Sequence, residues 1–434
     1  MSRETLPLTQ IKGRHSTKYR NRVLGYLSVL FVITLLDRIC LSVAGPRMQA
    51  DLHIGPVGWG WITGIFNLAY GLFEIPSGVL GDRIGSRKVL TRIVLWWSAF
   101  TALTGAVASF PILLIVRFCF GAGEAGAYPN ASIAVNRWFP LRERARAFGF
   151  LLMSAQLGSG LTPLLVVPIQ IHYGWRASFY CFGLLGVLWS IAWYAWFRDS
   201  PTEKSGISAA ELDEIRDLPP NADHSMPWSI AIRSTNLWSI CALAASYVYS
   251  LIFFQTWFHT YMIKGRGFHE TDLFLTVLPY LVAGGGNLLG GILGSVIVAR
   301  IGLTWGRRSL GIIGLGIASL AAVVLIYTKD RTVAVMALSL LYGGMTFQQP
   351  GVFAVCLDIG GKYAGATVGA MNTAGIFGGV FSSVIFGYLV SYYGNYTAPF
   401  IPMAALLVVG IFLWLKIDPT RQLISEASSE AHPA

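Results

Sequence analysis

Long apolar runs alternate with short polar connections along most of the chain. The runs are too long for strands and lack a period of two, so they predict helices. Each reaches or exceeds the ~20 residues that a helix needs to cross a bilayer. We therefore expect twelve spans, at residues 23–45, 57–80, 90–109, 111–135, 147–170, 177–197, 237–262, 273–298, 308–327, 332–357, 363–390 and 397–416.

The amino-acid composition agrees with a membrane protein. Hydrophobic residues make up 54% of the 434 residues and charged residues 12%, about half of the ~25% typical of soluble proteins. These values exclude an ordinary soluble enzyme, a disordered chain and a disulfide-stapled secreted domain. We expect the cysteines to be packing residues without a metal or disulfide pattern, because all five fall inside predicted spans: Cys40, Cys119, Cys181, Cys241 and Cys356.

The net charge of +11 is explained by topology. Twelve spans place both termini on one side, and 24 of the 32 basic residues fall on that side, in the tails and connections. By the positive-inside rule that side is cytoplasmic. The excess also attracts anionic lipid. Nucleic-acid binding is not expected, since no groove-reading motif is present. The first 22 residues lack a cleavable signal pattern, so we expect the first span to be retained.

A polar stretch divides the chain into halves of six spans. We expect a tail at 1–22, a first bundle at 23–197, a cytoplasmic linker at 198–236, a second bundle at 237–416 and a tail at 417–434. Within the linker, Ser208 and Glu211 have the spacing of a helix capping box.

The second half repeats the first. Gly78-Val-Leu-Gly81 matches Gly291-Ile-Leu-Gly294 at a separation of 213 residues, and Tyr173-Gly174 matches Tyr393-Gly394 at 220. Parallel halves with a site between them near mid-membrane are typical of transporters.

The connection between spans 2 and 3 contains the motif Gly78-Val-Leu-Gly-Asp-Arg-Ile-Gly-Ser-Arg-Lys88. This motif resembles the pattern G-x-L-x-D-x-x-G-x-[R/K]-[R/K] of the major facilitator superfamily, and every fixed position matches. The resemblance covers about residues 20–420 and implies an all-α membrane fold of twelve helices in two pseudo-symmetric six-helix bundles. It also implies a gating latch, to which we assign Gly78, Asp82, Arg83, Gly85 and Arg87. The repeated copy has Ser295 in place of the acid, so a latch in the second half is not expected.

Charged side chains at membrane depth are costly and usually functional. Asp37 and Arg38 lie within span 1, and Arg117 and Glu124 within span 4. Seven residues at 100° each come within ~20° of two full turns, so Arg117 and Glu124 share one helix face. An arginine fork suits a carboxylate, and a buried glutamate suits reversible protonation. The alternative for either pair is a static ion pair that fixes helix packing.

The same stretches are similar to the anion:cation symporter branch of the superfamily. Residues 37–42 resemble its span 1, although Cys40 stands where the branch commonly has Asn, and residues 117–129 resemble its span 4. The glycine pattern at Gly121, Gly123 and Gly126 lies inside a membrane helix, which favours close helix packing and a flexible span over dinucleotide binding.

Uncharged polar residues at span depth are candidates for binding substrate hydroxyls, with helix–helix hydrogen bonding as the alternative. These are Tyr70, Gln156, Gln255, Asn372 and, in an unusual doublet with Gln348, Gln349. Glu74 stands where sugar-acid members often have Gln, and is either a third protonatable group or a partner for the basic connection. His259 replaces a common Pro and is interpreted as a polar interface residue or a pH sensor.

We expect proton-coupled symport of a small organic anion, such as a hexonate or hexuronate, across a bacterial inner membrane by alternating access. Asp37 and Glu124 would carry the protons; Arg117, with Arg38, would bind the carboxylate. No cofactor is expected, the coupling ion being H⁺, with Na⁺ the alternative, and a monomer holds a complete site. The other hypotheses are an organic-anion or organophosphate exchanger, drug export, uptake of aromatic acids or dicarboxylates, and a transporter-like nutrient sensor. An enzyme is not expected, because the seven histidines are scattered and no nucleophile–base or metal constellation is present.

Overall fold

The computed structural model describes residues 18–216, 227–269 and 272–423, and this part of the chain is helical with no strand. The first half comprises α1 (Tyr19–Asp51), α2 (Pro56–Ile84), α3 (Ser86–Ala106), α4 (Phe110–Glu124), α5 (Ala127–Trp138), α6 (Leu141–Tyr173) and α7 (Trp175–Trp196). The second half comprises α10 (Thr235–Thr256), α11 (Phe258–Thr260), the π-helical turn η3 (Tyr261–Gly265), α12 (Leu273–Ile301), α13 (Leu303–Tyr327), α14 (Arg331–Gly360), the short η4 (Gly361–Tyr363), α15 (Ala364–Tyr393) and α16 (Phe400–Lys416).

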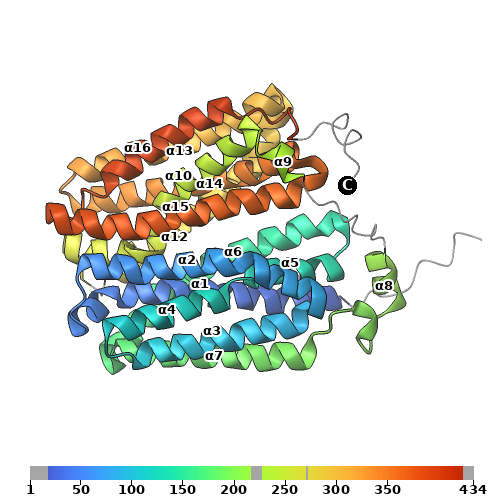
Figure 1. Cartoon of the computed structure of the whole chain (residues 1–434), viewed down its shortest axis with the longest axis horizontal. Helices are drawn as coiled ribbons and strands as arrows, with labels where there is room; N and C mark the ends of the chain where they lie inside the picture. Colours follow the sequence, from blue (N-terminus) through green and yellow to red (C-terminus); the bar gives the residue numbers. More distant parts are fainter. Residues whose placement is uncertain (1–17, 217–226, 270–271, 424–434) are drawn as a thin grey trace, which may run out of the picture.

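The helices form two bundles that lie side by side (Figure 1). Each bundle has six rods, because α4 and α5 continue one another, so the predicted twelve-helix fold is confirmed. Nine helical stretches of the described chain are long and apolar enough to cross a membrane. The other rods are α2 of 29 residues, α14 of 30 residues and the shorter apolar α16.

Large apolar side chains cover the outside of the bundles. Five examples, each 60–67% exposed, are Ile75, Ile115, Leu288, Leu320 and Phe412. Water would disfavour such a surface, whereas hydrocarbon does not. The chain is therefore an integral membrane protein.

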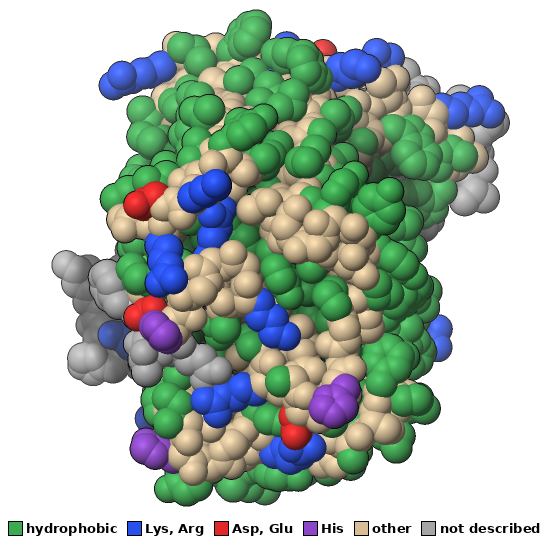
Figure 2. All heavy atoms as spheres, turned by 90° about the vertical axis from the view of Figure 1, so that its left-hand side faces the viewer, with side chains coloured by type: hydrophobic (Ala, Val, Ile, Leu, Met, Phe, Trp, Pro, Cys, Tyr) green, Lys and Arg blue, Asp and Glu red, His purple; other side chains and the backbone are tan. Residues whose placement is uncertain are grey.

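Two ends of the molecule are distinguished below. The terminal end carries the start of α1, the linker and the end of α16; the distal end carries the opposite connections, including the one between α1 and α2 (Figure 1). Figure 2 views the distal end and shows Lys and Arg side chains scattered over it. The described basic residues in the distal connections and helix ends are Arg47, Arg176, Lys264, Arg266, Lys329 and Arg331.

The two halves meet along α2 and α15 through glycines. A Cβ added at Gly60 would lie 2.6 Å from the Ser383 carbonyl oxygen, and one at Gly71 would lie 2.7 Å from Ile376 Cγ2. At Gly64 it would lie 2.8 Å from Val384 Cγ2. Only glycine permits this approach, so atoms of α15 pack directly against the backbone of α2 at these positions.

The fourth predicted span is not one continuous helix. It is divided after Glu124, where Gly126 adopts a φ of 93° and α5 begins one residue later. A positive φ is readily available to glycine, so the sequence breaks the helix at this point. The seventh span differs in a similar way: α10 ends at Thr256, and the chain continues through α11 into the π-helical turn η3. Such turns within helices are frequent at functional sites.

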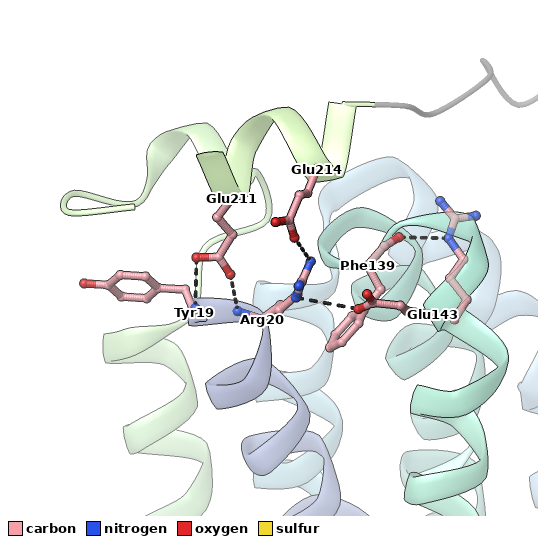
Figure 3. Close-up of polar contacts among 7 residues, drawn as sticks. Tyr19, Arg20, Phe139, Glu143, Glu211 and Glu214 are labelled. Carbon is pink, nitrogen blue, oxygen red and sulfur yellow. Dashed lines mark hydrogen bonds and ion pairs between the residues drawn. The ribbon is translucent and has the colours of Figure 1, made fainter. Parts of the chain in front are cut away.

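The linker contains the short 3₁₀ turn η2 (Pro201–Glu203), α8 (Ala209–Arg216) and α9 (Trp228–Ala231). The Ser208 hydroxyl accepts a hydrogen bond from the Glu211 N–H at 3.2 Å, as the capping box predicts. The Glu211 carboxylate, however, accepts from the backbone N–H groups of Tyr19 and Arg20 at 3.0 and 2.9 Å (Figure 3). The linker therefore caps the first turn of α1 and docks α8 on the first half.

Candidate functional site

A buried ion pair lies in the middle of the first half. Arg38 Nε on α1 donates to Glu124 Oε1 on α4 at 2.5 Å, and their side chains are 14% and 1% exposed. One further nitrogen of Arg38, Nη2, and the second oxygen of Glu124 are buried without a hydrogen-bond partner. A single hydrogen bond therefore joins the pair, and each of the two side chains still has an atom that could form another.

Arg117 lies on the same helix as Glu124, as the spacing predicts, but does not form an ion pair with it among the described residues. Its guanidinium lies 4.8 Å from the Phe66 ring centroid and 4.4 Å from that of Phe120. The side chain is buried, and its Nε has no hydrogen-bond partner. Arg117 is therefore the arginine whose fork is not held by a carboxylate.

Asp37 is also buried, next to these charges. Its carboxylate is acted on by the charges of Glu124 and Arg117. Both Asp37 oxygens and Trp97 Nε1 are buried without hydrogen-bond partners. A buried carboxylate without a partner is expensive to keep ionised.

A small cavity brings both arginines together with polar groups of the second half. Its walls are formed by Arg38, Leu41, Thr63, Phe66, Asn67, Arg117, Gln255 and Thr256. Three of the predicted residues, Arg38, Arg117 and Gln255, therefore line one space, and that space lies between the halves.

Thr63, Asn67 and Thr256 line the same cavity without having been singled out in the sequence. A signal was present on α2: Thr63, Asn67, Tyr70 and Glu74 are spaced by four, three and four residues, which places a polar stripe on one helix face. Asn67 Nδ2 also approaches Ser383 Oγ of α15 at 3.4 Å, across the two halves.

The remaining predicted polar residues lie outside the lining of this cavity. Tyr70 supports the Arg38 guanidinium, which lies 4.6 Å from its ring centroid. Gln156 is half-buried on α6, and Gln349 Oε1 accepts from Asn287 Nδ2 at 3.4 Å. Asn372 is half-buried on α15.

In the glutamine doublet, Gln348 Oε1 accepts from Trp414 Nε1 at 2.9 Å. Gln348 is therefore a packing residue, and Gln349 is the more exposed of the two.

The gating motif lies at the terminal end, where α2 joins α3. A Cβ on Gly78 would lie 3.3 Å from Pro129, and Gly85 has a φ of 89°. Arg87 Nε and Nη2 donate to the Tyr194 carbonyl oxygen at 2.9 and 2.6 Å. Arg83 is exposed, and the Asp82 side chain lies outside the described residues.

An acid that the sequence reasoning missed holds this motif. Asp199 Oδ1 accepts from Ser86 Oγ and the Arg87 N–H, both at 3.0 Å, and lies 3.4 Å from Arg137. In the second half, Arg307 pairs with Asp358 at 3.0 Å. An ion pair thus exists there despite Ser295, but both of its members belong to the second half.

His259 lies on α11 at the boundary between the halves. It is buried, its Nδ1 lies 3.3 Å from Ser42 Oγ of α1, and its Nε2 has no partner. It lines a second small cavity at the distal end. His259 is thus part of the contact between the halves, and both roles considered for it remain predictions.

The fold and the site define a membrane transporter of two repeated halves. The chain belongs to the Major Facilitator Superfamily, whose sequence pattern matches residues 27–383. It is 34% identical to the probable sulfoacetate transporter SauU of Cupriavidus necator, over 93% of this chain and 94% of that protein. It is 28% identical to the probable galactarate/D-glucarate transporter GarP of Escherichia coli, over 91% and 95% of the two chains.

A solved structure shares the fold. The crystal structure of a bacterial homologue of the human lysosomal transporter Spinster, in an inward-facing and unoccupied conformation, matches with a TM-score of 0.77. The match covers 93% of this chain and 98% of that one at 19% sequence identity, so it concerns the fold alone.

Proposed function

We propose that the protein takes up a small organic anion together with protons by alternating access. The observation that carries this proposal is the cavity between the halves, where the free fork of Arg117 and the singly bonded Arg38 lie beside two buried acids. Two relatives named as probable sulfoacetate and galactarate/D-glucarate transporters support an organic anion as cargo.

Arg117 is the group suited to receive the anion. Its guanidinium is buried against Phe66 and Phe120, so the aromatic rings hold it in place while leaving its edge unbonded. A planar fork binds two oxygens of a carboxylate or sulfonate at once. Thr63, Asn67 and Gln255 line the same cavity and supply neutral donors and acceptors for hydroxyl groups of a sugar acid such as a hexonate or hexuronate.

Glu124 and Asp37 are suited to carry the protons. Protonation of Glu124 removes the charge that holds Arg38, and the guanidinium is then free to move. Protonation of Asp37 removes a buried charge that repels an incoming anion. Proton and anion binding therefore favour each other, which is the reciprocal coupling that symport requires.

The orientation follows from the charges. The terminal end carries most of the basic residues, so we place it in the cytoplasm of a bacterial inner membrane, with both termini. In the described structure the halves are joined at the distal end, through contacts such as Ser42–His259 and Gln49–Thr260. Opening of the distal end would then expose the cavity to the outside.

Uptake by proteoliposomes under an imposed pH gradient tests the proposal. The substrates to compare are sulfoacetate, aldarates, aldonates, hexuronates, aromatic acids and dicarboxylates. We expect gradient-driven accumulation of at least one anion, lost in Asp37→Asn and Glu124→Gln and retained in Glu203→Gln, whose residue is exposed in the linker. If both buried-acid variants still accumulate substrate, proton coupling through them is wrong. Counterflow without pH dependence would indicate an exchanger instead.

A further inference from the structure

Glu74 on α2 is a half-buried acid that the proposed cycle has not used. It lies 10 residues before Ile84, the last of α2's 29 residues, well within the apolar rods. In the described part of the chain it makes no hydrogen bond or ion pair; the one charged side chain acting on it is Arg38. An unpaired carboxylate at this depth is a functional residue by default, and its partner should be identified.

The geometry identifies Arg38. Tyr70 and Glu74 are four residues apart on α2, so their side chains lie on one helix face, about one turn apart. The Arg38 guanidinium lies over the Tyr70 ring, 4.6 Å from its centroid. Its Nη2 is buried without a partner. Glu74 is thus a second carboxylate near Arg38. It lies one helical turn beyond Tyr70, the ring that supports the guanidinium, toward the terminal end.

The groups around Arg38 and Glu74 do not prevent these two side chains from pairing. The groups of α4 and α5 that act electrostatically on Arg38 are Glu124 and the Tyr128 hydroxyl. The charge of Glu74 also acts on Tyr128. Helix α15, which packs against α2 beside the polar stripe, contains no charged residue. On α3, Arg87 is held by the Tyr194 carbonyl and Arg92 is exposed. The charges of Asp37 and Arg117 act on each other, but these two described side chains form no ion pair.

We propose that Glu74 is the alternate carboxylate partner of Arg38, a positioning residue that receives the guanidinium when Glu124 is protonated. This rests on the proposed proton-coupled transport. With Glu124 ionised, Arg38 remains on Glu124. When Glu124 takes up a proton, the guanidinium turns across the face of Tyr70 and pairs with Glu74, one turn nearer the cytoplasm. The positive charge of Arg38 thus stays neutralised, and Arg117 remains the group that binds the anion.

The pH dependence of uptake tests this role in the full-length protein reconstituted in proteoliposomes. Glu74→Gln removes the alternate partner, so Arg38 continues to stabilise the ionised form of Glu124. We expect the alkaline limit of uptake to move to lower pH by about one unit, a tenfold higher proton concentration. Glu74→Asp keeps the charge on a shorter side chain and should shift the profile in the same direction by less. Glu203→Gln is the control and should leave the profile unchanged.

The results distinguish a failure of the role of Glu74 from a failure of the proposed function. A pH-dependent wild type with an unshifted Glu74→Gln profile overturns the role of Glu74 alone. A wild type whose transport does not respond to pH overturns the proposed function, and the role of Glu74 with it. If Glu74→Gln does not yield folded protein, the Glu74→Asp profile decides: coincidence with the wild type contradicts the alternate pairing.

Discussion

Lys264 Nζ donates to Gln49 Oε1 at 3.0 Å and thereby joins the π-helical turn η3 of the second half to α1 of the first. Gln49 Nε2 in turn donates to Thr260 Oγ1 at 3.2 Å. Trp59 Nε1 adds a third bond between the halves, to the Thr256 carbonyl oxygen at 3.3 Å. Because the halves must separate here for the cavity to open at the distal end, these bonds stabilise the distally closed state.

Removing the lysine should therefore shift the protein toward a distally open state. We expect Lys264→Ala to increase outside labelling of a cysteine at position 42, which is buried behind these bonds, by several-fold, since one hydrogen bond contributes ~1 kcal/mol. The measurement uses a membrane-impermeant thiol reagent in a background that lacks the five native cysteines. Lys329→Ala, at an exposed distal position, is the control. Equal labelling in the two variants would show that the Lys264 bond does not hold the gate.

Arg117 should not be replaceable by lysine. Arg117→Lys keeps the positive charge but loses the planar fork, so we expect KM for the anion to rise at least about tenfold. The measurement is initial uptake rate against substrate concentration. Arg300→Lys, an exchange of the same kind at an exposed site on α12, should leave KM unchanged. An unchanged KM in Arg117→Lys would contradict direct binding of the anion by the guanidinium.

Gly121 permits the approach of α4 to α2. A Cβ at this position would clash with the Phe66 carbonyl oxygen, and a backbone atom cannot move aside as a flexible side chain can. We expect Gly121→Ala to cost ~1–3 kcal/mol or more, seen as a lower melting temperature and a lower yield of monodisperse protein. Gly284→Ala on α12 has nothing within 4 Å of the added Cβ and should behave as the wild type. Equal stability of the two variants would refute the packing role.

Glu211 should contribute to stability without affecting transport. Glu211→Ala leaves the Tyr19 and Arg20 N–H groups without this acceptor and removes a negative charge from the N-terminus of α1, at a cost of ~1–2 kcal/mol. Faster proteolysis within the linker and a lower melting temperature in detergent would report the loss. Glu203→Ala should show neither change. A large fall in uptake with unchanged stability would point to a different role for α8.

The sequence was sufficient for the membrane fold because apolar run length is a local property. It also predicted that Arg117 and Glu124 share a helix face, since that follows from helical geometry alone. Which arginine pairs with Glu124 depends on how α1 packs against α4, and no local pattern determines this. The Arg38–Glu124 pair therefore emerged only from the three-dimensional arrangement.

The helix breaks and Asp199 illustrate the same limit. The Gly121–Gly126 pattern indicated flexibility, but not that α4 would end at Glu124. Asp199 stands in a polar segment that reads as linker, 113 residues from Ser86. Its contact with the gating motif requires the ends of α2 and α7 to meet at the terminal end, a long-range relationship that a polar segment does not encode.

The glycine contact between α2 and α15 has a consequence for the rate of the transport cycle. Where one helix presents only glycines to its partner, the two helices can roll or slide past each other with few rotamers leaving their packing minima. Gly60, Gly64 and Gly71 present such a face of α2, without side chains, to α15 along much of the contact between the halves. The barrier to reorientation would then be set by the few polar contacts at the distal end and by the charge state of the cavity, rather than by repacking along the whole length of the helices.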